Sequence, residues 1–66
     1  MHIKLNGEQR ELPGGLTVEQ LLGQENYRPE RVAVEVNLAI VPKRDYVTHV
    51  LQDGDTVEVV SFVGGG

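Results

Sequence analysis

The first residues alternate between apolar and polar and predict a half-buried strand followed by a hairpin. Ile3 and Leu5 are the apolar members, and the dipeptide Asn6-Gly7 that follows is the strongest short hairpin signal. A two-residue turn there pairs Leu5 with Glu8 and Ile3 with Arg10. This register puts both charged residues on the apolar face. We therefore expect the second strand to be a short sheet edge whose polar tips reach water.

The apolar spacing then changes from the period of a strand to that of a helix. Thr17 followed by Gln20 fits a capping box at the start of a short helix. Gly23 is the predicted stop. The residues spaced i, i+3 and i+4 form an apolar stripe suited to lying across a sheet: Val18, Leu21 and Leu22.

The second half of the chain again has strand-like alternation. We predict strands over 31–37 and 56–63, with a brief edge strand over 49–51, and Asp53-Gly54-Asp55 as the turn before the last strand. This order of elements predicts an α+β fold, in which a mixed sheet of four to five strands wraps one short helix. The first and last strands then lie side by side in the middle of the sheet.

Composition excludes several classes of function. The chain has 66 residues, a net charge of −4 and no cysteine, so thiolate metal sites and a catalytic thiol are excluded. Its two histidines are far apart in sequence, and we expect no metal site. The basic residues are scattered and no apolar run could span a membrane, so we expect neither a nucleic-acid nor a membrane partner. A cytoplasmic protein is the default, and Tyr27 and Tyr46 are interpreted as half-buried residues with wet hydroxyls.

Gly64-Gly65-Gly66 directly follows the last predicted strand. Three residues without Cβ atoms can thread a channel too narrow for any other residue, and would present the Gly66 carboxylate to another protein's active site. The same glycines could instead be a frayed end or a cloning remnant. We divide the chain into a folded domain of 1–63 and a flexible tail of 64–66.

The last strand also predicts a docking surface beside that tail. If Val57 and Val59 face the core, then Val60 and Phe62 face outward as an exposed apolar pair, and Val63 extends it. Exposed large apolar side chains on a small acidic protein indicate a contact surface. The alternative is that a loop or the chain's own tail covers Phe62.

Three features together resemble a known family. These are the order of elements, the ending Phe62-Val63-Gly64-Gly65-Gly66, and the run Val36-Asn37-Leu38-Ala39-Ile40-Val41-Pro42. Together with the Asp-Gly-Asp turn, they resemble the ThiS-type sulfur carriers of thiamine thiazole biosynthesis, which have a ubiquitin-like β-grasp fold. The resemblance spans the whole chain.

The resemblance implies a protein that is not an enzyme but a co-substrate of enzymes. An E1-like, ThiF-type adenylating enzyme would use ATP and magnesium to activate the Gly66 carboxylate. Sulfur from a cysteine-derived donor would then convert it to a thiocarboxylate, which a ThiG-type thiazole synthase would receive. Gly64 and Gly65 would thread the partner's channel, and this chain would bind no cofactor or metal of its own.

Other functions share the same features. The small subunit of molybdopterin synthase, or a carrier for another sulfur pathway, would have the same glycine ending, although 66 residues favour the thiazole pathway. A ubiquitin-like modifier joined through Gly66 to target lysines, or a simple binding module with a remnant for a tail, are alternatives of a different class.

Overall fold

The computed structural model describes residues 1–62. Val63, Gly64, Gly65 and Gly66, and with them the predicted boundary between domain and tail, lie outside the described residues. The elements in chain order are β1 (His2–Leu5), β2 (Glu8–Glu11), α1 (Val18–Gln24), η1 (Pro29–Arg31), β3 (Val32–Val36), β4 (Ala39–Ile40), η2 (Lys43–Asp45) and β5 (Thr56–Ser61).

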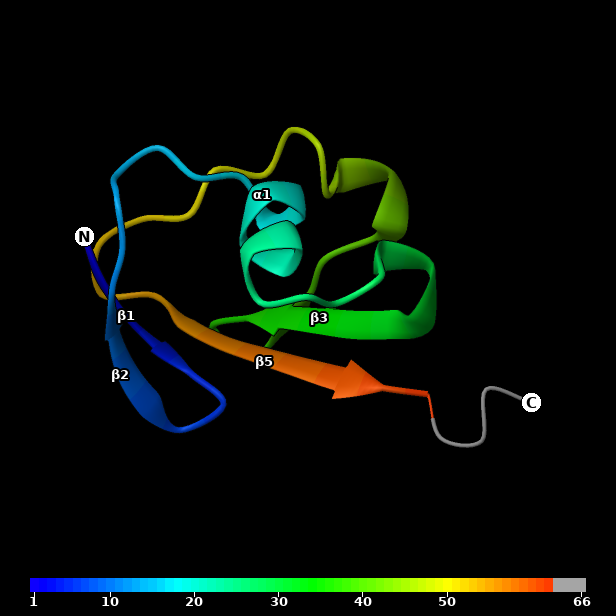
Figure 1. Ribbon diagram of the computed structural model, residues 1–66, viewed down its shortest axis with the longest axis horizontal. Coiled ribbons are helices and arrows are strands. Elements are labelled where there is room, and N and C mark those ends of the chain that lie inside the picture. Colours follow the sequence, from blue (N-terminus) through cyan, green and yellow to red (C-terminus); the bar gives the residue numbers. More distant parts are fainter. Residues whose placement is uncertain (63–66) are drawn as a thin grey trace.

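The strands form one mixed sheet in the order β2-β1-β5-β3-β4, with α1 lying across one face (Figure 1). β1 and β5 run parallel, whereas the other neighbouring pairs are antiparallel. This arrangement confirms the predicted α+β class and the central position of the first and last strands. The core between α1 and the sheet consists of Ile3, Leu5, Val18, Leu21, Leu22, Val32, Val34, Val36, Val41, Tyr46, Leu51, Val57 and Val59.

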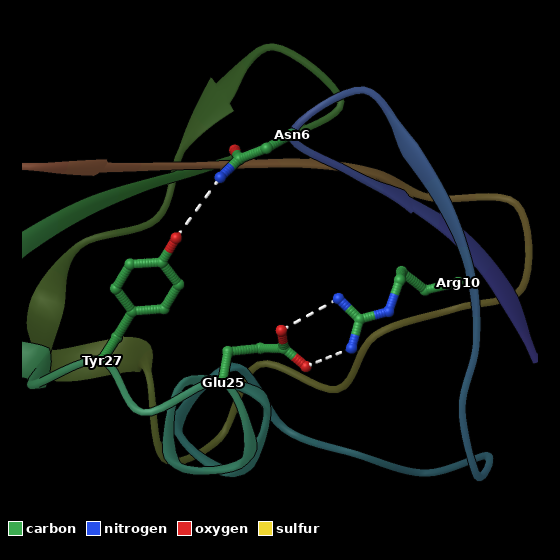
Figure 2. Close-up of polar contacts among 4 residues, drawn as sticks. All are labelled: Asn6, Arg10, Glu25 and Tyr27. Carbon is green, nitrogen blue, oxygen red and sulfur yellow. Dashed lines mark hydrogen bonds and ion pairs between the residues drawn. The ribbon is translucent and has the colours of Figure 1, made fainter.

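The first hairpin has the predicted register. Ile3 lies opposite Arg10 and Leu5 opposite Glu8, and β2 is an edge strand as expected. Arg10 does more than reach water, because its guanidinium makes two hydrogen bonds of 2.9 and 2.6 Å to the Glu25 carboxylate (Figure 2). A bidentate pair of this kind satisfies a charge placed on the apolar face and joins β2 to the end of α1.

The helix begins with the predicted capping box. Thr17 Oγ1 accepts a hydrogen bond from the Gln20 N–H at 3.2 Å, and Gln20 Oε1 accepts one from the Thr17 N–H at 2.9 Å. The apolar stripe is buried, with Val18 and Leu22 at 0% exposure and Leu21 at 1%. Capping thus fixes where the helix starts, and burial of the stripe fixes which side faces the sheet.

The predicted stop at Gly23 is wrong. The helix continues through Gly23 to Gln24, and Asn26 adopts the left-handed conformation with φ 65°. The Asn26 N–H donates to the Gly23 carbonyl at 3.2 Å and the Tyr27 N–H donates to the Leu22 carbonyl at 2.9 Å. These two bonds make a Schellman motif in which asparagine, rather than glycine, is the left-handed residue.

A hairpin that the sequence did not predict follows β3. β3 is shorter than the expected 31–37, and the turn Asn37-Leu38 joins it to the two-residue strand β4. Both turn residues have positive φ, 53° and 71°. Glycine is the usual second residue of such a turn, so a leucine there conceals the hairpin signal.

The expected edge strand over 49–51 is also wrong. Its backbone pairs with the segment that leads into α1: the Val18 N–H donates to the His49 carbonyl at 2.9 Å, and the Leu51 N–H to the Leu16 carbonyl at 2.8 Å. Only the single bridge between Thr17 and Val50 has strand geometry. The segment therefore anchors the helix start rather than extending the sheet.

Tyr46 is more buried than expected, whereas Tyr27 is partly buried as predicted. Tyr46 is 3% exposed and its hydroxyl donates to the Val32 carbonyl at 3.2 Å, so the prediction of a wet hydroxyl is wrong. Burial raises the pKa of this hydroxyl, because ionisation in the core is unfavourable. The carbonyl it caps lies on the β4 side of β3, beyond the end of the short β4, where no further strand within residues 1–62 pairs with β3.

A polar cluster fastens the new hairpin to the start of β5. Asp55, 8% exposed, accepts hydrogen bonds from Asn37 Nδ2 at 2.9 Å and from the Gln52 N–H at 2.8 Å. Asn37 Oδ1 in turn accepts from the Thr56 N–H at 2.9 Å. Asp55 therefore closes the Asp-Gly-Asp turn, as the sequence suggested, and also fixes β5 relative to β3.

We predict that Asp55→Ala lowers the free energy of unfolding by about 1–3 kcal/mol, because it leaves partly buried donors on Asn37 and Gln52 without their acceptor. The matched control is Glu30→Ala, which removes the same charge from an exposed position and should change stability by less than about 0.5 kcal/mol. Chemical denaturation measures both. Equal midpoints for the two variants would show that the cluster contributes nothing to stability.

Candidate functional site

β5 separates a core-facing set of side chains from an exposed set, as its alternation predicted. Val57 is 0% exposed and Val59 is 7% exposed, whereas Val60 and Phe62 are 59% and 56% exposed. No loop among residues 1–62 covers Phe62. The outward orientation of Val60 and Phe62 is therefore confirmed, while their role in an interface stays a prediction.

The pairing of β5 with β3 continues past the last residue of the strand. The Phe62 N–H donates to the Arg31 carbonyl at 3.0 Å, one residue before β3 begins. Phe62 is thus held by the sheet itself, directly before Val63 and the three glycines. This places an exposed aromatic residue, with its backbone bonded beside β3, next to the predicted reactive end of the chain.

The outer face of the sheet carries one apolar side chain that the sequence did not single out. Ile40 is 72% exposed and lies across from Glu35, which itself lies across from Glu58. On the next row, Ala33 lies across from Val60. Facing residues of neighbouring strands lie on one side of a sheet, so Ile40 shares a face with Val60. Placing Ile40 on this face depends on the pairing of β4 with β3, and the sequence did not predict β4.

Leu38 stands at the tip of the same hairpin and is 86% exposed. A left-handed leucine is uncommon, because the conformation costs about 1–3 kcal/mol and persists only where the surrounding structure enforces it. The Asn37 bonds to Thr56 and Asp55 hold the turn in place. The large exposed apolar residues on or directly beside this half of the sheet are therefore Leu38, Ile40, Val60 and Phe62.

The described residues contain little that could act as a reacting centre. Across residues 1–62, no group of three or more His, Asp or Glu side chains could hold a metal ion. The two shifted pKa values belong to structural residues: the pKa of Arg10 is raised by its hydrogen bond and charge interaction with Glu25, and that of Tyr46 by burial. In this part of the chain, no helix has the length and apolar character needed to cross a bilayer.

Comparison with known proteins decides the family. The model of the ThiS family matches residues 3–66, which include the glycine ending as well as the folded part. The chain belongs to the ThiS family. It is 33% identical to the sulfur carrier protein ThiS of Escherichia coli, over all 66 residues of this chain and 100% of that protein.

Solved structures of the ThiS family agree with the fold described above. The crystal structure of a thiamine biosynthesis protein, ThiS, from Geobacter metallireducens has a TM-score of 0.86 and is 30% identical, with complete coverage of both chains. This match confirms the ubiquitin-like β-grasp fold that the resemblance implied.

Two larger relatives are thiazole synthases. The chain is 47% identical to a thiazole synthase of Paramagnetospirillum magneticum and 48% identical to one of Magnetococcus marinus, in each case over all 66 residues. It spans only 20% of the length of those proteins, in their N-terminal parts. Those two synthases thus contain a ThiS-like region within a longer polypeptide.

Proposed function

We propose that this chain is a sulfur carrier for the formation of the thiazole of thiamine, with the Gly66 carboxylate as the carrier site. The observation that supports it most strongly is the family match through residue 66, together with the full-length similarity to a sulfur carrier protein ThiS. The names of these relatives favour the thiazole pathway over molybdopterin synthesis or protein modification.

The chemistry of a terminal carboxylate explains why partners are needed. Its pKa is about 3.3–3.7, so at neutral pH it is an anion and a poor electrophile. An E1-like, ThiF-type enzyme would let a carboxylate oxygen attack the α-phosphorus of ATP with magnesium bound, releasing pyrophosphate. Sulfur from a cysteine-derived donor, supplied at the oxidation level of sulfide, would then attack the acyl-adenylate, displace AMP and leave a thiocarboxylate on Gly66.

The chain itself would bind neither the nucleotide nor the metal, and would act as a co-substrate rather than as an enzyme. It contains no cysteine, so the terminus is the position on this chain where transferable sulfur can be held. The dependence of the proposed reaction on ATP supports a cytoplasmic location. A ThiG-type thiazole synthase would accept the sulfur, and the ThiS-like regions of two thiazole synthases support that pairing.

Two parts of the chain would contribute separately to recognition by the partner enzyme. Gly64 and Gly65 would enter the partner's channel, where side chains have no room. Val60, Phe62 and Val63 would dock on the enzyme surface and offset the entropy of ordering the glycines, about 1–2 kcal/mol per residue. Val60 and Phe62 are suited to this because they are exposed, one on β5 and one directly after it, where the backbone is paired with β3.

The first prediction concerns the carrier site. When the adenylating enzyme, ATP, magnesium and the sulfur donor are supplied, intact mass should show replacement of one oxygen by sulfur, and removal of Gly66 should abolish it. A shortened chain that still gains the sulfur mass would show that Gly66 is not the site.

The second prediction concerns the glycine channel. Gly65→Val should block adenylation, because a branched side chain would clash in a channel fitted to glycine. Gly14→Val is the control, since a Cβ at Gly14 meets nothing within 4 Å and its φ is not positive. Pyrophosphate release measures both variants. Normal release with Gly65→Val would mean that the channel is wide.

The third prediction concerns docking. Phe62→Asp should weaken binding to the thiazole synthase by about 2 kcal/mol or more, as loss of an interface anchor does, while changing stability by less than about 0.5 kcal/mol. Val47→Asp is the control, because Val47 has a similar exposure of 54% but lies in the loop after η2. Equal affinities of the two variants would remove Phe62 from the interface.

A further inference from the structure

The backbone edges of the sheet are not equally protected against pairing with another strand. β2, at one edge, has the sequence Glu-Gln-Arg-Glu, and charged residues discourage strand addition. β4, at the other edge, is two residues long and is soon followed by Pro42. A third unpaired stretch of backbone belongs to the central strand β5, on the side where β5 extends beyond the end of β1. Residues 59–62 in this stretch are Val-Val-Ser-Phe, with neither charge nor proline.

The direction of the hydrogen bonds along β5 shows which of its residues direct their backbone groups toward this unpaired side. Thr56 and Phe62 bond toward the β3 side, to Asn37 and Arg31. Val57 faces the other way, because its carbonyl accepts from the Asn6 N–H at 2.9 Å at the end of β1. Since a strand alternates, residues 59 and 61 also direct their N–H and C=O groups to the β1 side, where β1 has ended.

The Asn6 side chain protects only the first backbone N–H group on this side of β5. Its Oδ1 accepts the Val59 N–H at 2.8 Å, so the hairpin turn takes the first of these donors, and its Nδ2 donates to the Tyr27 hydroxyl at 3.5 Å (Figure 2). The next donor on this side, the Ser61 N–H, has no partner among residues 1–62. Ser61 is exposed, and no side chain of the described part reaches its backbone.

Two backbone carbonyls at comparable positions on β3 do have partners. Beyond β4, the Val34 carbonyl accepts from the Val41 N–H at 2.9 Å and the Val32 carbonyl accepts from the Tyr46 hydroxyl at 3.2 Å. Side chains or loops thus cap part of the exposed strand backbone on both sides of the sheet, whereas the uncharged edge at Ser61 is open among residues 1–62.

We propose that an extended segment of the thiazole synthase pairs with β5 at this edge, exchanging backbone hydrogen bonds with Ser61. This inference rests on the proposed function. Two observations favour the synthase as the occupant. The edge is continuous with the exposed side chains of Val60 and Phe62 and leads into residues 64–66, and two thiazole synthases contain a region similar to this chain. Strand addition here sets the direction in which the glycines enter the active site.

The test compares Ser61→Pro with Ser61→Ala. Proline removes the Ser61 N–H but leaves the bonds of β5 to β3, which use the alternate residues. Loss of one interfacial backbone bond should weaken binding to the synthase about tenfold. Ser61→Ala keeps the N–H and should bind as the unmodified chain does. Equal affinities for both variants, with both folded, would overturn the proposal.

Amide hydrogen exchange on the unmodified chain gives an independent answer that does not depend on a variant folding. In the free chain, the Ser61 amide should exchange faster than the Phe62 amide, and saturating synthase should slow it about tenfold or more. Unchanged exchange at Ser61 in the complex would overturn the proposal. So would protection that appears with chain concentration alone, because a second copy would then occupy the edge.

These outcomes are separate from those of the proposed function. If Gly66 gains sulfur and the synthase binds, but Ser61 stays unprotected, only the edge pairing is wrong. If Gly66 gains no sulfur with the complete activating system, the proposed function is wrong and the edge pairing falls with it.

Discussion

The position of β5 between β1 and β3 is the constraint on which the rest of the structure depends. Because β5 runs parallel to β1, the chain must cross over between them, and α1 lies in that crossover and covers the sheet. Val57, at 0% exposure, packs in the middle of the core. The last described residues therefore follow directly on a central strand, and the packing of that strand in the core fixes their position (Figure 1).

Local signals predicted the first half of the fold better than the second. The register set by Asn6-Gly7 and the capping box at Thr17 were predicted correctly, because each depends on neighbouring residues and on a known turn or cap geometry. The β4 hairpin was missed, since Leu38 occupies a position where glycine is the recognisable signal. The burial of Tyr46 was missed because its hydroxyl bonds to a carbonyl 14 residues away. No local pattern indicates such a contact.

The candidate site was partly predictable for the same reason. Alternation along the last strand identified Val60 and Phe62 as outward residues, and their exposure confirms it. Ile40 joins their face only through the pairing of β4 with β3, which requires the three-dimensional structure. The open backbone edge at Ser61 was also beyond sequence reasoning, because it depends on where β1 ends and on the reach of the Asn6 side chain.

The central claim is that Gly66 carries sulfur in the cell, and intact mass with fragmentation tests it most directly. The chain should be isolated from its own cells after deletion of the thiazole synthase gene, so that a carrier loaded with sulfur has no acceptor and accumulates. The proposed function predicts one oxygen replaced by sulfur, with fragmentation placing it at Gly66. An unmodified carboxylate in every molecule, or Gly66 joined to lysines of other proteins, would contradict it.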